Sequence, residues 1–218
     1  MKAIVSLSGG MDSATVLQLA LDMGREVEAV GFFYGSKHNK YENEAAKAIA
    51  DHCRIPFRLI DWSSIAQGFR SNLMQDGGEI PEGYYQATNM SLTVVPARNL
   101  IFASILAGIA WSEGAGEVWL GIHAGDHAIY PDCRPGFFNA MSLAVDMGTD
   151  GNVSLRAPFL YDTKFGILEY GSKHGVQYQL TRTCYKDQPI ACGKCGACQE
   201  RLEAFAQRGL KDPIEYEV

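Results

Sequence analysis

Residues 3–17 read AIVSLSGGMDSATVL, and they give the clearest indication of the fold class. Residues 3–7 form a short apolar run typical of a buried strand, and residues 14–23 carry the apolar spacing of a helix. Between them lies Ser-Gly-Gly-Met-Asp-Ser. Because glycine lacks a Cβ, Gly9 and Gly10 let the backbone approach an anion closely, at a helix N-terminus whose free N–H groups favour negative charge. The stretch therefore predicts a strand, a phosphate-binding loop and a helix.

The side chains of this loop supply further groups that suit a phosphate. Ser8 and Ser13 carry hydroxyl donors, whereas Asp12 fits such a loop only as a Mg²⁺ ligand or a helix cap. The alternative is a strand-to-helix turn with a serine cap, which is ordinary for Gly-Gly alone but unusual for the whole string. The loop of P-loop kinases and GTPases is absent, because the Gly193-Lys194 pair is followed by cysteine.

Apolar runs and helical stretches continue to alternate along the chain. We expect further strands at residues 27–33, 57–60, 118–122 and 153–157, and helices at 41–53, 100–112, 137–147, 164–174 and 199–208. This alternation predicts an α/β fold with an open parallel sheet and helices on both faces. Residues 61–93 break the pattern, and a loop of that length is usually a lid, a binding loop or a small insertion. We expect one nucleotide-binding α/β domain at residues 1–180, with a C-terminal segment at 181–218 packed on it.

Charge and hydropathy narrow the class of function. The 218 residues carry a net charge of -6, which argues against a protein that coats nucleic acid through its overall charge and favours a small-molecule substrate. No run reaches the ~18 consecutive apolar residues that span a bilayer. The N-terminal residues lead directly into the first expected strand without a signal-peptide pattern, so we expect a cytoplasmic protein that contacts no membrane.

Four of the six cysteines lie close together near the C-terminus. Cys184, Cys192, Cys195 and Cys198 are separated by seven, two and two residues, and the last three cysteines have small residues between them in the string CGKCGAC. In a reducing compartment such a cluster indicates a metal rather than disulfides. Four thiolates about 2.3 Å from Zn²⁺ complete a tetrahedral structural site, so we expect one Zn²⁺ per chain that activates no water. An Fe–S cluster is the alternative, because it also uses closely spaced cysteines.

Further strings give these motifs a specific resemblance. Residues 95–99 read VPARN, residues 130–135 read YPDCRP, and residues 183–185 read TCY. The loop at residues 8–13 resembles the PP-loop of the ATP pyrophosphatases. Taken together in this order, the strings resemble the 7-cyano-7-deazaguanine synthase family of queuosine biosynthesis over nearly the whole chain. Residues 33–38 depart from the family pattern, as does Met11, where glutamine is frequent.

The resemblance implies an adenine nucleotide alpha hydrolase-like fold and an ATP-dependent carbon–nitrogen ligase. With ATP and Mg²⁺, such an enzyme activates the carboxylate of 7-carboxy-7-deazaguanine, ammonia gives the amide, and a second activation leaves the nitrile. The resemblance also implies a homodimer. The residues that it places around ATP are Leu7, Ser8, Gly9, Gly10, Met11, Asp12, Ser13, Ala14, Thr15, Val16 and Leu17.

Charged residues outside the loop are expected to complete the site. Arg98 and Lys164 would neutralise charge on the phosphates, and with Asp12 and Asp132 they form the expected catalytic set. Asp126, Asp132 and Arg134 are expected to bind the polar edge of the substrate. Plain alternatives stay open at this stage: a surface ion pair for Arg98, a solvated helix-start lysine for Lys164, and either a nucleophilic or a structural role for Cys133.

Three other functions are compatible with the motifs. The activated carboxylate could pass to an amine on a protein or another molecule, which the departure at residues 33–38 leaves open. A PP-loop enzyme that modifies tRNA is the second, although the low basicity disfavours it. The third is a non-enzymatic module that binds zinc and nucleotide.

Overall fold

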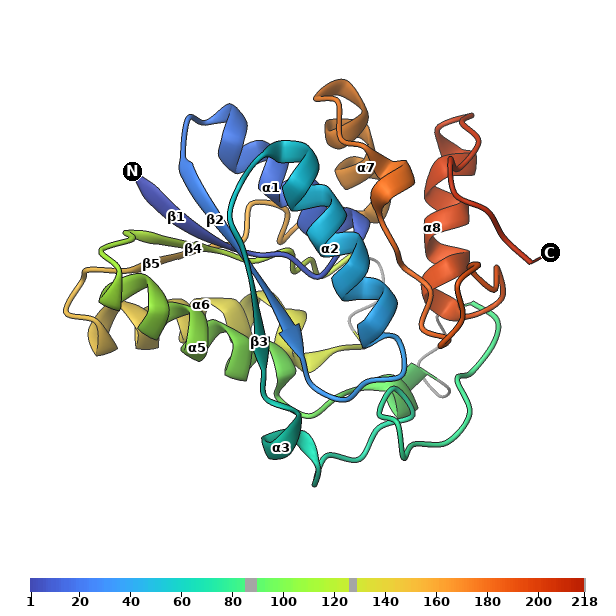
Figure 1. Cartoon of the computed structure of the whole chain (residues 1–218), viewed down its shortest axis with the longest axis horizontal. Coiled ribbons are helices and arrows are strands. Elements are labelled where there is room, and N and C mark those ends of the chain that lie inside the picture. The colour runs from blue at the N-terminus through green and yellow to red at the C-terminus, as the bar shows by residue number, and fades with distance from the viewer. Residues whose placement is uncertain (85–89, 126–128, 218) are drawn as a thin grey trace.

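A five-stranded parallel sheet forms the centre of the computed structural model, which describes residues 1–84, 90–125 and 129–217 (Figure 1). The strands are β1 (Lys2–Ser6), β2 (Glu26–Phe33), β3 (Phe57–Asp61), β4 (Glu117–Trp119) and β5 (Ser154–Arg156), in the order β3-β2-β1-β4-β5. Ala3 of β1 lies opposite Val27 of β2 on one side and Glu117 of β4 on the other. The chain order changes direction between β1 and β4, and ligands of such sheets bind at the carboxyl ends of the strands at this point.

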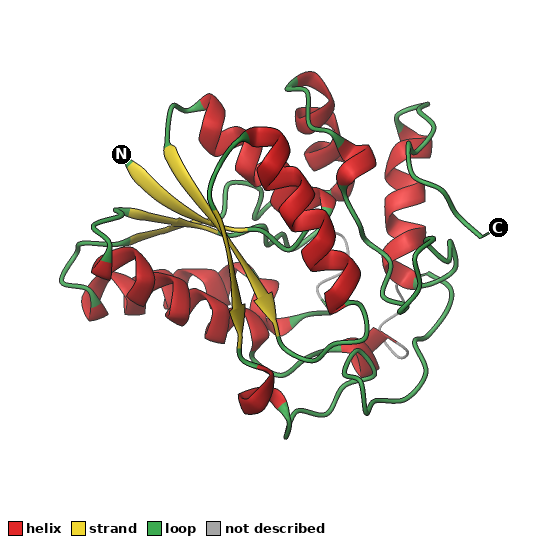
Figure 2. Ribbon diagram, in the orientation of Figure 1, coloured by secondary structure: helices red, strands yellow, loops and turns green. Residues whose placement is uncertain are grey.

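Helices cover both faces of the sheet (Figure 2). One face carries α1 (Met11–Asp22), α2 (Asn39–Cys53) and α7 (Lys164–Lys173), and the other carries α5 (Arg98–Ser112) and α6 (Pro135–Gly148). Side chains of β1 alternate between these layers, since Ala3 and Val5 pack with α1 whereas Ile4 packs with α5. The predicted open parallel sheet with helices on both faces is confirmed.

The strand boundaries differ from the prediction most clearly at β4. We expected a strand at residues 118–122, but the ladder ends at Trp119, and Leu120 to Ile122 continue as loop. Space around Gly121 is limited, because a Cβ on this residue would lie 3.0 Å from the backbone nitrogen of Ser13 in α1. The chain after β4 therefore runs directly against the beginning of α1.

The segment Ser91–Ser112, which includes α5, is apolar and long enough to cross a membrane by length and composition alone. In the fold, Ala103, Leu106 and Ala110 of α5 are buried in the core under the sheet. The helix therefore has the role of a core helix in an α/β enzyme fold.

The C-terminal segment packs beside α7 through α8 (Gly196–Gln207). Arg201 of α8 is completely buried, and its guanidinium donates to both carboxylate oxygens of Asp212 at 2.6 and 2.9 Å. The same guanidinium donates to Thr181 Oγ1 at 2.6 Å. These contacts connect α8 to the chain segments that precede and follow it. The expected boundary between a domain at residues 1–180 and a segment at 181–218 stays a prediction.

The described residues between β3 and α5, 62–84 and 90–97, are mainly loop, with the short α3 (Ser63–Ala66) and a 3₁₀ turn at Ser91–Thr93. Two further 3₁₀ turns lie at Pro131–Cys133 and Tyr178–Leu180. The loop reaches the cysteine segment, because Gly83 N donates to Lys194 O at 2.8 Å and Glu82 pairs with Lys186. Residues 80–83 of this loop therefore pack against the cysteine segment.

Candidate active site

A cavity of about 210 Å³ lies at the carboxyl ends of β1 and β4. Its wall combines residues from distant parts of the chain: the PP-loop, the beginnings of α2, α5 and α7, the segment after β4, and the C-terminal segment. The loop residues that line it are Leu7, Ser8, Gly10, Met11, Asp12 and Ser13. The remaining members of the predicted ATP-binding stretch, Gly9 and residues 14–17, lie behind this surface.

Serine hydroxyls hold the PP-loop in a closed turn. Ser13 Oγ donates to Gly10 O at 3.0 Å and lies 3.1 Å from Ser8 Oγ, and Ser8 N donates to Ser13 Oγ at 3.2 Å. α1 begins at Met11, so its first N–H groups point toward the cavity side of this turn. A turn of this kind, ahead of a helix twelve residues long, can bind an anionic phosphate.

Gly9 is required by packing as well as by backbone conformation. Its φ is +85°, and a Cβ at this position would lie 2.3 Å from Glu42 O and 2.9 Å from Ala46 N. The first turn of α2 therefore lies directly against the back of the PP-loop. Gly10 is the glycine that lines the cavity.

Lys164 is the centre of a charge cluster beside the loop. Its Nζ lies 2.6 Å from Asp12 Oδ2 and 3.2 Å from Glu200 Oε2, and the side chain is only 10% exposed. Burial alone would lower the pKa of Lys164, but the two carboxylates outweigh burial and raise it. The lysine is therefore a permanent cation, and a solvated helix-start lysine does not describe it.

The two carboxylate oxygens of Asp12 differ in their contacts: Oδ2 lies near Lys164 and His123, and Oδ1 has no hydrogen-bond partner among the described residues. Burial alone would raise its pKa, but Lys164 and then His123, whose Nε2 is 3.6 Å from Oδ2, lower it, so Asp12 is ionised. Its Oδ1 is buried without a hydrogen-bond partner among the described residues. An unpaired carboxylate oxygen beside a phosphate loop suits the Mg²⁺ that accompanies ATP.

Replacing Lys164 with methionine should lower kcat/KM for ATP by about 10²–10³, the usual effect of removing one preorganised group that stabilises developing charge. Methionine keeps the length of the side chain but leaves Asp12 and Glu200 without their cation. Steady-state ATP consumption measures the effect. Lys173→Met, at the exposed far end of the same helix, is the matched control and should keep full activity. Near-normal turnover by a folded Lys164→Met protein would contradict the expected role of Lys164 in neutralising charge on the phosphates.

Arg98 and Asp132 lie near each other at the N-terminus of α5 but differ in their access to the cavity. Arg98 lines it, and its Nη1 donates to Tyr34 Oη at 3.4 Å, so a surface ion pair does not describe this residue. Asp132 Oδ2 accepts from Asn99 N at 2.8 Å and caps the helix, and Asp132 is not among the described residues that line the cavity. Arg134 is exposed at the N-cap of α6. Asp126 lies outside the described residues.

Cys133 has the properties of a structural thiol. Its side chain lines the cavity and accepts from Asn99 Nδ2 at 3.3 Å. Burial, followed by the charge of Asp132, raises the pKa of Cys133 to about 12. Since the thiolate is the nucleophilic form, a thiol with this pKa is unreactive at neutral pH.

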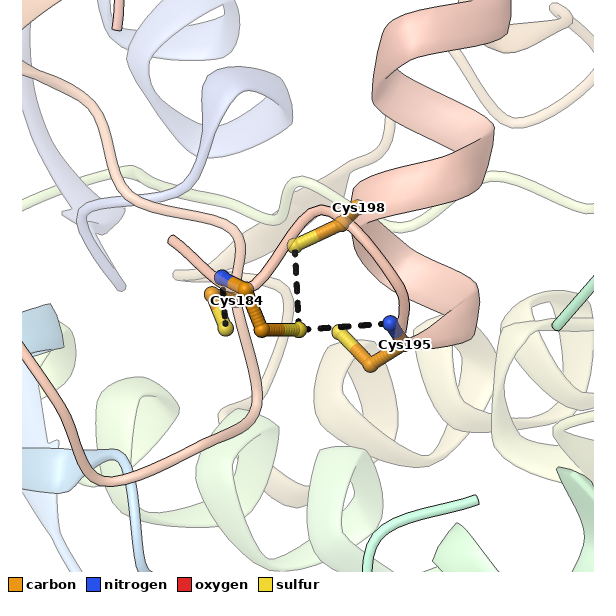
Figure 3. Close-up of side chains that lie close together, drawn as sticks. Cys184, Cys195 and Cys198 are labelled. Atoms are coloured by element: carbon orange, nitrogen blue, oxygen red, sulfur yellow. Dashed lines mark hydrogen bonds between the residues drawn. The ribbon is translucent and has the colours of Figure 1, made fainter. Parts of the chain in front are cut away.

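The four clustered cysteines form a site that fits a metal ion. Their sulfur atoms all lie within 4.8 Å of one another and all four residues are buried. Figure 3 shows Cys184, Cys195 and Cys198 converging at the beginning of α8. Backbone N–H groups of Lys186, Lys194 and Cys195 donate to the sulfurs at 3.3–3.4 Å, as expected where thiolate charge must be stabilised. The four-cysteine metal site expected from the spacing is thus assembled in the fold.

Several residues of the cavity are not expected from the sequence. Glu42 looked like an ordinary surface residue of an amphipathic helix, and Glu200, Arg182 and Tyr185 belong to the segment that we assigned only to metal binding. Position relative to the sheet could have identified Glu42, because it follows the carboxyl end of β2 within the first turn of the next helix. Nothing local to the sequence indicates that Glu200 reaches Lys164.

Comparison with known proteins identifies the family of this chain. The family model described as queuosine biosynthesis protein QueC matches residues 2–209. The chain belongs to the QueC family. Proteins named 7-cyano-7-deazaguanine synthase from Caldicellulosiruptor bescii and Pseudoalteromonas translucida are 47% and 44% identical to this QueC-family chain. The matches cover 100% of the chain and 98% of the first protein, and 99% of each for the second.

Solved structures with a similar fold are more distant in sequence. The U34-tRNA thiolase NcsA from Methanococcus maripaludis, with its [4Fe-4S] cluster, matches with a TM-score of 0.55 and 15% identity. That match covers 95% of this chain and 65% of the thiolase. NMN synthetase from Francisella tularensis matches with a TM-score of 0.51 and 16% identity, over 96% of this chain and 77% of the synthetase. At these identities the likeness establishes the PP-loop fold alone.

Proposed function

We propose that this chain is an ATP-dependent ligase that converts 7-carboxy-7-deazaguanine and ammonia to 7-cyano-7-deazaguanine. The observation that carries the proposal is the 44–47% identity, over essentially the whole length, to proteins named as synthases of that product. The cavity supports it, because it joins a phosphate loop to three cationic side chains, Arg98, Lys164 and Arg182. An acid must be activated before an amine can displace its oxygen, and this arrangement suits ATP as the activator.

In the proposed reaction, a carboxylate oxygen of the substrate attacks the α-phosphorus of ATP, and pyrophosphate leaves. Ammonia adds to the acyl-adenylate and expels AMP, which gives the amide. The amide oxygen then attacks a second ATP in the same way, and loss of AMP with two protons leaves the nitrile. The PP-loop and the N-terminus of α1 stabilise the charge that grows on the departing pyrophosphate.

Each charged side chain of the cavity has a separate role in the proposed reaction. Lys164 neutralises the pyrophosphate from the α7 side, Asp12 would hold the Mg²⁺ that accompanies the nucleotide, and Arg98 faces the incoming carboxylate. Asp132 contributes by fixing the N-terminus of α5, and so the position of Arg98. Asp126 and Arg134 remain proposed contacts of the substrate's polar edge.

The four cysteines would hold one Zn²⁺, since four thiolates with small residues between them favour a closed tetrahedral site. Bound there, Zn²⁺ supplies structural cross-linking and no open position for chemistry. The reducing environment that such a site needs is that of the cytoplasm, where we place the protein. A net charge of -6 disfavours a nucleic-acid partner. Exposed apolar side chains on adjacent helices, such as Trp111 of α5 and Met147 of α6, favour a homodimer.

Incubation with ATP, Mg²⁺, ammonia and 7-carboxy-7-deazaguanine tests the proposal. Mass spectrometry should detect the amide first and then the nitrile. Accumulation of conjugates with an added amine, and no nitrile when ammonia alone is present, would favour the amide ligase instead. ATP turnover without any change in the deazaguanine would refute both.

The position of attack on ATP can be tested with oxygen-18 in the substrate carboxylate. Attack at the α-phosphorus transfers the substrate oxygen to AMP, so we expect the label there after both activation steps. Attack at the γ-phosphorus would instead give an acyl-phosphate and ADP, and the label would appear in inorganic phosphate. Mass spectrometry of the separated products distinguishes them. Label in phosphate and none in AMP would exclude adenylation while leaving a ligase reaction in place.

A further inference from the structure

Three carboxylates line the cavity within the part of the chain that the structure describes: Asp12, Glu42 and Glu200. Asp12 and Glu200 both hold the Lys164 ammonium, at 2.6 and 3.2 Å. Glu42 differs from them, because its contact is with His38, whose Nε2 lies 3.4 Å from Glu42 Oε2. Burial, with the charge of Arg98, lowers the pKa of His38 to about 3, so this imidazole is neutral and provides no counter-charge.

The Glu42 carboxylate is therefore an acceptor that faces the cavity without a charged partner at hydrogen-bond distance among the described residues. Its side chain is 17% exposed, and the exposed part lines the cavity. Burial raises the pKa of Glu42 to about 7, although Arg98 and Arg182 act in the opposite direction. Because both arginines are near, this position disfavours a metal cation and favours neutral N–H donors.

Two tyrosines lie beside His38, the residue that contacts this carboxylate. Tyr34 Oη lies 3.5 Å from His38 Nε2, and the rings of His38 and Tyr185 lie 5.3 Å apart. Both tyrosines line the cavity. The end of the cavity near Glu42 therefore combines flat apolar surfaces with one open carboxylate, a combination suited to a planar heterocycle with donors on its edge.

The arrangement of donors distinguishes the two bases that the proposed reaction brings to this cavity. A guanine-type ring presents N1–H and the 2-amino group side by side, and a carboxylate accepts from both at once. Adenine presents its 6-amino donor beside the N1 lone pair, which a carboxylate repels. We propose that Glu42 binds the N1–H and 2-amino edge of the deazaguanine substrate and determines the specificity for that base. This inference rests on the proposed function for the identity of the base.

The test compares two ligands in the absence of ATP: 7-cyano-7-deazaguanine and 7-cyano-7-deazahypoxanthine, which lacks the 2-amino group. The unmodified protein should prefer the first by about 10- to 100-fold, the effect of one hydrogen bond to a charged group. In Glu42→Gln, which keeps the size of the side chain, the preference should fall to a few-fold or less. Glu42→Asp keeps both acceptor oxygens and should retain a clear preference. Glu44→Gln, exposed two positions further along α2, should behave like the unmodified protein.

Three outcomes would overturn the inference. Equal weakening of both ligands in Glu42→Gln would indicate a structural role. An increased KM for ATP with the preference intact would assign Glu42 to the adenine ring. Absence of any preference in the unmodified protein would show that the 2-amino group is not recognised. If the protein has the expected preference but forms no nitrile, this inference stands and the proposed function fails.

Discussion

Gly9→Val should abolish ATP consumption. The branched side chain would begin with a Cβ 2.3 Å from Glu42 O, at a φ of +85° that valine rarely adopts. Either the PP-loop or the first turn of α2 must move, and both line the cavity. We expect turnover to fall by more than about 10³-fold, since displacement of positioning groups by even ~1 Å costs ~10²-fold. Coupled detection of released pyrophosphate measures it.

Two further variants separate loss of the site from loss of the fold. Gly24 also has a positive φ of +68°, but a Cβ there would meet nothing within 4 Å. Gly24→Val should therefore cost about 1–2 kcal/mol of stability and leave turnover intact. Ser13→Ala removes the hydroxyl that closes the loop without adding bulk, and it should lower turnover while the protein stays folded. Normal ATP consumption by folded Gly9→Val would refute the assignment of the phosphate loop.

Cys195→Ser should remove the metal and strongly destabilise the protein. Loss of a metal belongs to the changes that cost more than about 4 kcal/mol, which for a chain of this size lowers Tm by roughly 8–16 °C. Turnover should fall as well, because the segment from Thr181 through α8 brings Arg182, Tyr185 and Glu200 to the cavity wall. Elemental analysis and thermal unfolding measure both effects.

Cys53→Ser is the control, since Cys53 is half-buried at the end of α2 and lies outside the cluster. Detection of iron, with visible absorbance, in the purified protein would show that the four cysteines hold an Fe–S cluster and not zinc. A freshly purified protein with no metal at all would contradict the metal site, and so would an unchanged Tm in Cys195→Ser.

Local patterns of residues were enough to predict the parts of the molecule that depend on neighbours a few positions away. The strand, loop and helix around Gly9 follow from apolar spacing and from two glycines. The cysteine site follows from four thiols within fifteen residues, so the chain needs only one local turn to bring them together. The alternation of strands and helices gave the sheet and its two helical layers, because each apolar face must be buried against another.

Tertiary structure alone decided which charged groups share the cavity. Asp12 and Lys164 are separated by 152 positions and meet only because β1 and the segment leading to α7 end at the same edge of the sheet. Asp132, which we expect at the substrate, is held in the fold by a hydrogen bond that its Oδ2 accepts from Asn99 N at the beginning of α5. Glu42 and Glu200 have ordinary local sequences, and their placement depends on how α2 packs against Gly9 and how α8 packs on α7. No short-range pattern encodes such contacts, because they arise when separate elements bury their faces together.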